Sequence, residues 1–413
     1  MRLILLFLCC LSANMYAQCS GGNRFKKQVF PNITVTKDIT YGNADRYDVF
    51  GANNPQPIKL DFYAPTGDTM QARPLVLLFF GGAFLLGDKG DADVKAWCDS
   101  LAHCGYAAAS VNYRLGYNQL NSKSAIRATY RGVQDARAAI RFLKENHQQY
   151  KIDTNRIFIA GESAGAIIGL HTSFLRAETD RPAETYGITG ENQDLGCLDC
   201  SGNTYAHTVE IKGLISLWGA INDVNSITQN ERTPTLLIHG TSDAIVNIDQ
   251  GPPFNLPNYP AVYGSIPLHA RFDALGIYNE FYPYQGQPHL FYGIQTGTVT
   301  FPNQYWQPVF TQGQQFLYTV LQRICVSTET ATNTVFDLKI SPNPAHNYLT
   351  ISLPEAGFEP CTLEIFDING KLVLSQKIVE NSTNIPLQGM APGLYLAKAQ
   401  TKNKVFRGKV SIN

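Results

Sequence analysis

The sequence predicts an α/β domain that is followed by a small all-β domain. From about residue 25 to residue 324, short apolar runs alternate with longer segments of helical pattern. Strands that are apolar along most of their length and alternate with helices are typical of a mostly parallel sheet covered on both faces. Beyond about residue 330 the helical pattern stops, and short alternating strands follow. That second pattern predicts a small β-sandwich.

The first region contains the elements of one α/β domain. Its predicted strands are the apolar runs 58–63, 75–80, 106–113, 156–160, 211–218, 235–239 and 278–284. Its predicted helices are 91–103, 125–145, 164–175, 266–275 and 308–322. Pro308 suits the first turn of the last helix, where its missing N–H costs nothing. We place the α/β domain at residues 18–326.

The tail contains strands alone. They are predicted at 348–353, 362–368, 372–379, 393–399 and 405–412. Asn369-Gly370 lies between two of these strands and is the strongest short signal for a β-hairpin. The polar segment 327–334 reads as a linker. We therefore place a linker at 327–337 and the C-terminal domain at 338–413.

The composition excludes several classes of protein. The chain has 413 residues with 33 Lys+Arg and 33 Asp+Glu, and 44% of its residues are hydrophobic. This composition argues against disorder, which needs low hydrophobicity and high net charge. It also gives no basic excess of the kind that nucleic-acid binders usually have. After the first residues no apolar run reaches the roughly 18 residues of a membrane span, so we expect neither nucleic-acid binding nor a transmembrane segment.

The N-terminus predicts export. Arg2 precedes the apolar run 3–11, and small residues lead to Ala17. A charged start, a short apolar core and a cleavable end are the features of a signal peptide, which we place at 1–17. Cys19 raises the alternative of a lipoprotein anchor. Gln18 argues against that alternative, because a lipid-modified cysteine needs a small residue directly before it.

Nine cysteines bear on this interpretation. Two of them leave with the signal peptide, and the odd remainder of seven implies at least one free thiol outside the cytoplasm. Cys197 and Cys200 form a CxxC in a polar loop. No second CxxC or nearby histidine pair completes a zinc site, so we expect a short local disulfide. With Cys361 assigned to the tail, we expect complete pairing of the other six: Cys19, Cys98, Cys104, Cys197, Cys200 and Cys325.

The segment 161–165, Gly-Glu-Ser-Ala-Gly, is the sharpest functional signal. It lies between the predicted strand 156–160 and the predicted helix 164–175, which is the context of a nucleophile elbow. The turn is so tight that the positions flanking it must be very small, and the helix dipole favours negative charge developing at Ser163. A glycine-rich tight turn without catalytic function is the alternative. We interpret Ser163 as a nucleophile.

A serine nucleophile needs a base, and the base needs an orienting acid. In chains with this elbow the acid and then the histidine follow the serine. Asp243 follows the buried strand 235–239, and its alternative role is a helix cap or turn aspartate. Asp223, after the preceding strand, is the reserve candidate. His289, just after the last predicted strand, fits the base best, and we assign His239 to loop geometry.

The developing oxyanion needs two backbone N–H groups. One is expected from Ala164, directly after the nucleophile. The other is expected from the loop that follows strand 75–80, where Gly82 and Ala83 lie in the sequence Phe-Gly-Gly-Ala-Phe. Small residues in this loop would let a substrate carbonyl approach the backbone. An ordinary glycine turn is the alternative interpretation.

With these motifs, residues 40 to 325 resemble the α/β-hydrolase superfamily, in its hormone-sensitive-lipase-like and carboxylesterase branch. The matching segments are 80–84, 110–115, 161–165, His239-Gly240 with Asp243, and His289. The resemblance implies hydrolysis of carboxylic esters through an acyl-enzyme, without a cofactor or a metal. One departure is Phe80, because the family often has a histidine there that supports the oxyanion loop.

The tail resembles the C-terminal sorting domain of the type IX secretion system of Bacteroidetes. Pro342-Asn343-Pro344, then Gly393-Leu394-Tyr395, then Lys409 carry this resemblance. It implies the type IX secretion machinery as a partner, passage across the outer membrane, and a secreted or surface-attached product. A carbohydrate-binding β-sandwich is the alternative. The few aromatic residues of the tail argue against it, because most fall in strand patterns consistent with a core.

Two segments are expected to shape the pocket. The polar segment 176–207 lies where hydrolases insert a cap, and the Pro- and aromatic-rich segment 251–263 follows Asp243. The function expected is a secreted carboxylesterase acting on small-molecule or polysaccharide-linked esters, with acetyl and feruloyl esters as candidates. One alternative is a peptidase of the prolyl-oligopeptidase kind, although the region before residue 40 is too short for the usual propeller. A catalytically inactive surface binding protein is the other.

Overall fold

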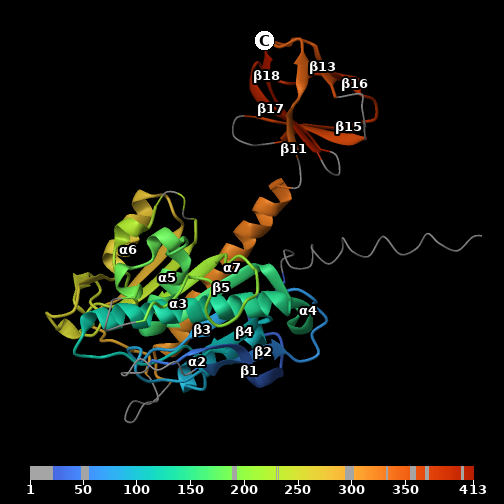
Figure 1. The fold of residues 1–413 in the computed structure, drawn as a ribbon. Helices are drawn as coiled ribbons and strands as arrows, with labels where there is room; N and C mark the ends of the chain where they lie inside the picture. The colour runs from blue at the N-terminus through green and yellow to red at the C-terminus, as the bar shows by residue number, and fades with distance from the viewer. Residues whose placement is uncertain are drawn as a thin grey trace, which may run out of the picture. The chain divides into compact units, whose positions relative to one another are not determined.

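A computed structural model describes residues 22–47, 55–187, 193–228, 230, 232–293, 302–331, 334–353, 360–367, 372–400 and 404–413. The chain divides into two units, Met1–Leu321 and Gln322–Asn413, and each has its own fold (Figure 1). The predicted fold class, a mostly parallel α/β sheet followed by a small β-sandwich, is confirmed. The predicted signal peptide, Cys19 and the Asn369-Gly370 turn lie outside the described residues. None of the helices in these ranges combines the length and hydropathy that a membrane span requires.

The first unit is built on one large sheet. In the described residues its strand order is β1-β2-β4-β3-β5-β6-β7-β10. From β4 to β10 neighbouring strands run parallel, whereas β2 pairs antiparallel with both β1 and β4. The strands are β1 (Ile33–Asp45), β2 (Pro55–Pro65), β3 (Arg73–Phe79), β4 (Ala107–Val111), β5 (Ile152–Glu162), β6 (Gly213–Leu217), β7 (Thr235–Gly240) and β10 (Asn279–Tyr284).

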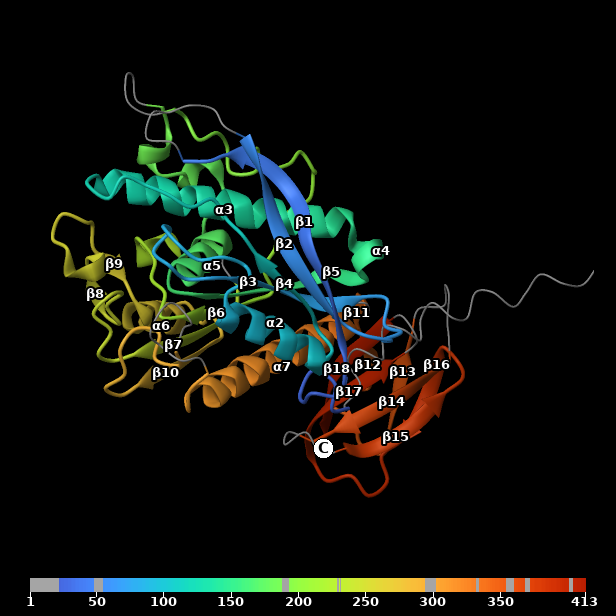
Figure 2. The same ribbon diagram turned by 90° about the horizontal axis from the view of Figure 1, so that it is seen from below.

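Helices cover both faces of this sheet. Figure 2 shows α3 and α5 on one side of the strands and α2 and α7 on the other. On the second side Trp97 of α2 contacts Trp306 and Phe310 of α7, with ring centroids 5.5 and 5.2 Å apart. The helices are α2 (Ala92–Cys104), α3 (Ser122–Glu145), α4 (His147–Tyr150), α5 (Ala164–Phe174), α6 (Ser265–Ala274) and α7 (Trp306–Ala331), and the two-residue strands β8 (Gln250–Gly251) and β9 (Val262–Tyr263) pair with each other.

The edge strand β1 is absent from the sequence-based prediction. Most of its residues are half-buried or exposed, and its pairing with β2 shifts between Thr36 and Ile39 and again between Thr40 and Gly42. Ile33, Val35, Ile39 and Tyr41 do alternate with polar residues, but Lys37 and the two register shifts interrupt this pattern, which is therefore weaker than the continuous apolar runs of the inner strands. The inner strand β3, by contrast, is buried at every position and was readily predicted.

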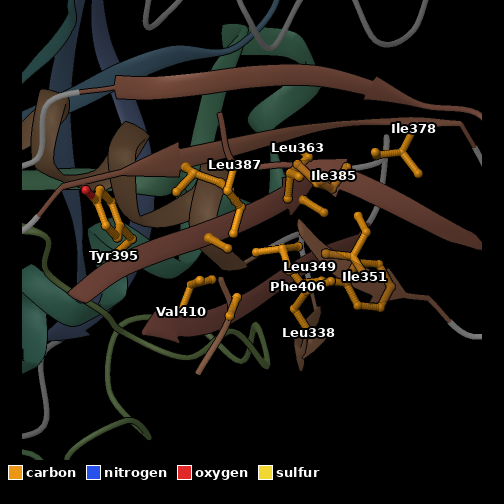
Figure 3. Close-up of a cluster of buried hydrophobic side chains, with 14 of the residues drawn as sticks. Leu338, Leu349, Ile351, Leu363, Ile378, Ile385, Leu387, Tyr395, Phe406 and Val410 are labelled. Atoms are coloured by element: carbon orange, nitrogen blue, oxygen red, sulfur yellow. The ribbon is translucent and has the colours of Figure 1, made fainter. Parts of the chain in front are cut away.

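The second unit is a β-sandwich of two sheets. Strands β11-β18-β17-β14-β15 form one sheet in the described residues, and β12-β13-β16 form the other. Figure 3 shows the apolar side chains that gather in its core, among them Leu349, Leu363, Phe406 and Val410. The strands are β11 (Thr334–Asp337), β12 (Lys339–Ser341), β13 (Tyr348–Ser352), β14 (Cys361–Phe366), β15 (Leu372–Ile378), β16 (Ser382–Pro386), β17 (Gly393–Gln400) and β18 (Lys404–Ile412).

The segment 327–337, placed as a polar linker, contains regular structure. Helix α7 continues to Ala331, and β11 begins at Thr334. The segment carries neither glycine nor proline, so nothing in it forces the helix to end where its apolar pattern ends. Its β-branched residues then pair with β18.

The expected pairing of six cysteines is wrong. Cys197 and Cys200 form the predicted local disulfide, and Cys325 is also disulfide-bonded. Cys98 and Cys104, however, are free, buried thiols. They lie six residues apart on α2, which separates them by about 9 Å along the helix axis, beyond the Cα spacing that a disulfide bridges. Cys361 in the tail is the third free cysteine among those described.

Candidate active site

Ser163 lies in a strained turn between β5 and α5. Its backbone has φ 51° and ψ −117°. The turn brings neighbouring chain so close that a Cβ atom on Gly161 would lie 2.4 Å from the carbonyl carbon of Gly165. A Cβ on Gly165 would lie 2.0 Å from the carbonyl oxygen of Phe79. The two glycines of the motif are therefore required by close approach, and they hold the serine at the end of the strand.

The three side chains expected to form a triad lie in direct contact. The Ser163 hydroxyl donates to His289 Nε2 at 2.9 Å, and His289 Nδ1 donates to Asp243 Oδ2 at 2.6 Å. The carboxylate can only accept, which assigns the proton to Nδ1 and leaves Nε2 free to accept from the serine. The residues follow the C-terminal ends of the parallel strands β5, β7 and β10. This edge of a parallel sheet is where ligands approach.

Asp243 is held as a carboxylate. It is 6% exposed, and its Oδ1 accepts from the Ile245 and Val246 N–H groups at 2.8 and 2.9 Å. Burial alone would raise the pKa of Asp243. Hydrogen bonds from His239 and His289, the attraction of His289 and the Val246 N–H outweigh burial, so this pKa lies well below its usual range. At neutral pH the group therefore carries its charge.

His239 has a contact that the sequence-based interpretation missed. It was assigned to loop geometry, yet its Nε2 lies 3.1 Å from Asp243 Oδ2. The reserve acid Asp223 lies elsewhere, because its side chain accepts from the Asn225 N–H at the start of a 3₁₀ turn. The sequence does show a histidine four residues before Asp243. Whether the side chains of the two residues meet depends on how the loop between them bends, which the sequence pattern does not indicate.

The predicted oxyanion loop lies against the nucleophile. Gly82, Ala83 and Phe84 have positive φ values of 106°, 53° and 61°. A Cβ on Gly82 would lie 2.1 Å from the Leu86 carbonyl oxygen, so this position needs glycine. Ala83 and Ala164, two of the three expected N–H donors, both line a cavity that also contains Ser163.

Tyr113 supports this loop from beneath. Its hydroxyl donates to the Phe80 carbonyl at 3.0 Å and lies 3.3 Å from the Gly81 carbonyl. Its ring stacks on Phe80 with centroids 4.3 Å apart. Position 80, where the resemblance implied a histidine, carries Phe80 in this chain. The hydroxyl of Tyr113 instead binds the loop, through the backbone carbonyl of Phe80.

We expect Tyr113→Phe to lower kcat for ester hydrolysis about tenfold, because the lost hydroxyl leaves buried carbonyl groups unpaired at a cost of about 1–3 kcal/mol. Steady-state kinetics with p-nitrophenyl esters measures this effect. Tyr395→Phe is the matched control, since Tyr395 donates to the Ala391 carbonyl at 2.7 Å in the second unit. Equal rates for the two variants would contradict a role of Tyr113 in the loop.

A buried pair of acids lies behind the nucleophile. Glu162 directly precedes Ser163, and its Oε2 accepts from the Tyr292 hydroxyl at 2.6 Å. Its carboxyl also hydrogen-bonds Asp93 of α2. Burial and the neighbouring Asp93 raise the pKa of Glu162 well above its usual range, and burial raises the pKa of Asp93. Two carboxyl groups in this arrangement share a proton, so the pair does not bring two charges beneath the serine.

Two cavities in the described part of the chain meet at Ser163. The first has a volume of about 330 Å³ and is lined by apolar and aromatic side chains, including Phe84, Tyr130 and Tyr259. The second has a volume of about 270 Å³, and His289 belongs to its wall. Both segments expected to shape the pocket contribute, 176–207 through Pro182 and Glu184 and 251–263 through a run that includes Phe254.

Ion pairs attach the polar segment 176–207 to α3. Asp199, inside the disulfide-closed loop, pairs with Arg137 and Arg141, each through an N–O distance of 2.6 Å. Leu198 packs in a cluster with Tyr130 and Val133, which both line the first cavity. The loop therefore packs against α3 and holds in place the part of the first cavity's wall that α3 provides.

Comparisons with known proteins bear on both units. Residues 60–233 match the family BD-FAE, a range that contains Ser163 and ends before Asp243 and His289. Residues 339–413 match the family described as secretion system C-terminal sorting domain. The two matches fall on separate parts of the chain.

Several curated lipases and esterases are similar to part of the chain. Lipase 1 of Geotrichum candidum is 27% identical over 29% of this chain and 22% of its own length. Bile salt-activated lipase of Homo sapiens is 29% identical over 36% of this chain and 19% of its own length. Esterase LipI of Mycobacterium tuberculosis is 33% identical over 26% of this chain and 31% of its own length. The chain thus spans less than a third of each of these relatives.

Solved structures with similar folds include a truncated carbohydrate esterase from gut microbiota and Thermogutta terrifontis esterase 2 phosphonylated by cyclosarin. The first is 18% identical with a TM-score of 0.47, and the match covers 70% of this chain and 96% of the other. The second is 19% identical with a TM-score of 0.48, over 70% and 95% of the two chains.

Proposed function

We propose that this protein is an exported serine hydrolase that cleaves carboxylic esters through an acyl-enzyme, a proposal supported by the BD-FAE match of residues 60–233 and the sorting-domain match of residues 339–413. The observation that carries this proposal is the continuous set of hydrogen bonds from Ser163 through His289 to Asp243. The same order of nucleophile, base and orienting acid performs acyl transfer on several unrelated folds.

The proposed reaction begins with attack of Ser163 Oγ on the ester carbonyl carbon, while His289 Nε2 takes the hydroxyl proton. The N–H groups of Ala164 and of the loop at Gly82 and Ala83 receive the oxyanion. The tetrahedral intermediate collapses, the ester C–O bond breaks, and His289 returns the proton to the departing alcohol. Water then attacks the acyl-enzyme with His289 again as the base, which regenerates Ser163 and releases the acid.

Asp243 serves this cycle without changing its own protonation. Its carboxylate keeps the His289 proton on Nδ1, so that Nε2 faces the serine at every turnover. It also stabilises the positive imidazolium that forms during each proton transfer.

The position of His289 indicates which cavity would receive the alcohol of the ester and which would receive its acyl group. The departing alcohol oxygen must receive a proton from His289 Nε2, so the alcohol lies on the side of the second cavity, whose wall contains His289. The acyl group then extends into the first cavity on the other side of Ser163. The acyl side is therefore the larger and more aromatic one.

Cavity size distinguishes the two ester classes under consideration. An acetyl group would leave most of the first cavity, of about 330 Å³, without contacts. An aromatic acyl group such as feruloyl would fill much of it and contact the rings of Phe84, Tyr130 and Tyr259. We therefore propose that the enzyme prefers large, aromatic acyl groups, carried on a small alcohol or on a polysaccharide.

The test compares kcat/KM for methyl ferulate with kcat/KM for methyl acetate. We expect the ferulate ester to react at least tenfold faster, and a preference for acetate would contradict the acyl assignment. Aminoacyl p-nitroanilides test the peptidase alternative in the same assay, with no turnover expected. Failure of a fluorophosphonate probe to label the native protein would favour an inactive binding protein.

The sorting domain indicates export to the cell surface or medium. We propose that residues 338–413 engage the type IX secretion machinery, that 1–17 directs the first step of export, and that 327–337 joins the tail to the catalytic domain at 18–326. The tail would then serve delivery, while hydrolysis belongs to the first unit.

A further inference from the structure

His239 is a completely buried histidine on the acid side of the triad. It lies at the end of β7 and is 0% exposed. Its Nε2 lies 3.1 Å from Asp243 Oδ2 and 2.9 Å from the Val246 carbonyl oxygen. Its Nδ1 lies 2.9 Å from Ser265 Oγ at the start of α6. Every polar atom of the ring therefore has a partner.

These partners fix where the proton is. A carboxylate and a carbonyl oxygen both accept hydrogen bonds and cannot donate. Nε2 must carry a hydrogen to face them, and this holds whether the ring is neutral or charged. Ser265 Oγ can both donate and accept, so it satisfies Nδ1 in either case. His239 consequently donates to Asp243 in each of its protonation states.

The donation from His239 completes the hydrogen bonding of Asp243. Oδ1 is already held by the backbone N–H groups of Ile245 and Val246. Oδ2 is the oxygen that faces His289, and His239 is the second donor to that same atom. Without it, the described hydrogen bonds to Oδ2 reduce to the one from His289, and the two backbone N–H groups on Oδ1 would alone have to keep the carboxylate in line with the imidazole.

We propose that His239 is a positioning residue of the catalytic machinery, which orients Asp243 Oδ2 toward His289 and shares the carboxylate charge. The inference rests on the proposed function, because it assigns His289 and Ser163 their roles. A single chain of side-chain hydrogen bonds then runs from Ser265 through His239, Asp243 and His289 to Ser163. Its two ends lie on α6 and on the elbow before α5.

The surroundings of His239 limit what else could affect it. From the loop that follows β7 the carboxylate of Asp243 faces it, and from α6 the uncharged hydroxyl of Ser265 does. On the neighbouring strand β10 its register partner is Pro283. Among these facing residues Asp243 is the ionisable one, so a change at His239 reaches catalysis through Asp243.

His239→Leu removes the donor and replaces the imidazole with an apolar side chain of similar bulk. We expect the rate of Ser163 modification by a fluorophosphonate to fall about 10- to 100-fold, by analogy with the loss caused by removing a hydrogen-bond partner of a metal-binding histidine or carboxylate. The carboxylate, no longer sharing its charge with Nε2–H, should favour the imidazolium form of His289 more strongly. The acid limb of the rate against pH should therefore move to higher pH.

A conservative variant and a control separate positioning from packing. In His239→Gln the side-chain amide keeps an N–H donor near Asp243, so we expect most of the rate and the native acid limb to return. His269→Leu is the matched control, because His269 of α6 contacts Asn279 and is outside the chain of hydrogen bonds. It should react as the native protein does. Should His239→Leu not fold, Ser265→Ala tests the same chain, with a smaller slowing and a shift of the acid limb in the same direction.

The measurement uses the purified full chain and follows fluorophosphonate labelling of Ser163 from pH 5 to pH 9. This readout needs no ester of the correct class. A native protein that does not label would contradict the proposed function itself. A native protein that labels, together with His239→Leu or Ser265→Ala variants that keep the native acid limb, would overturn the role of His239 and leave the proposed function standing.

Discussion

Ser163→Ala is expected to lower kcat for ester hydrolysis by about five to six orders of magnitude, as removal of a serine nucleophile does in a serine protease. Oγ is the atom that forms the acyl bond, and alanine offers nothing to replace it. The fold should be retained, because the required glycines at 161 and 165 remain and alanine adds no atom to the turn. Hydrolysis of p-nitrophenyl esters measures the rate, and thermal unfolding checks the fold.

Ser216→Ala provides the matched control for this substitution. Ser216 is a buried serine of β6, and its hydroxyl is without a hydrogen-bond partner in the described structure. Its removal should leave the activity unchanged and should not lower stability, since an unsatisfied buried hydroxyl is lost. Retention of more than about one hundredth of native activity in Ser163→Ala would remove this residue from the mechanism.

Asp243→Asn should lower kcat about 10⁴-fold at neutral pH, because the amide presents a donor to His289 Nδ1 and selects the wrong tautomer. With its proton on Nε2, His289 would have no lone pair for the Ser163 hydroxyl. Asp223→Asn is the control, since Asp223 is exposed and binds its own 3₁₀ turn. Similar losses in both variants, or less than a tenfold loss in Asp243→Asn, would contradict the assignment.

The same residue predicts how stability depends on pH. The pKa of Asp243 is lower in the folded protein than its usual value near 3.8. Its ionised form therefore stabilises the fold fully above about pH 4 and loses this effect as pH falls toward the folded value. Thermal unfolding from pH 7 to pH 2 should show a shallower acid loss for Asp243→Asn than for the native protein. Parallel curves would argue that the hydrogen bonds around Asp243 do not matter for stability.

The parts of the site that follow strand ends were predictable from sequence. The elbow is encoded locally, because two glycines flank one serine between an apolar run and a helix. Asp243 and His289 follow recognisable strands, so a parallel sheet brings them to the same edge as Ser163. Chain order then leaves few candidates for each role.

The supporting contacts were not predictable, because they join distant segments. Tyr113 reaches the Phe80 carbonyl across 33 positions of sequence, and His239 reaches Ser265 across 26. No periodicity records such contacts, since they depend on the packing of separate elements. Strand β1 was missed for another reason, because Lys37 and its bulges interrupt its alternating pattern. The pairing of Cys98 and Cys104 was expected from the number of cysteines, whereas their spacing on one helix already argues against it.

The division of the site into two cavities has a consequence for how its specificity can be changed. Apart from residues at their junction such as Ser163 and Phe254, the walls come from different segments of the chain. Substitutions at Pro182 or Tyr259 change one wall and leave Leu86 and Leu290 in the other untouched. Mutations at such separate positions usually add independently. We therefore expect substitutions in the first wall to change the selectivity for the acid of the ester while leaving the selectivity for its alcohol unchanged.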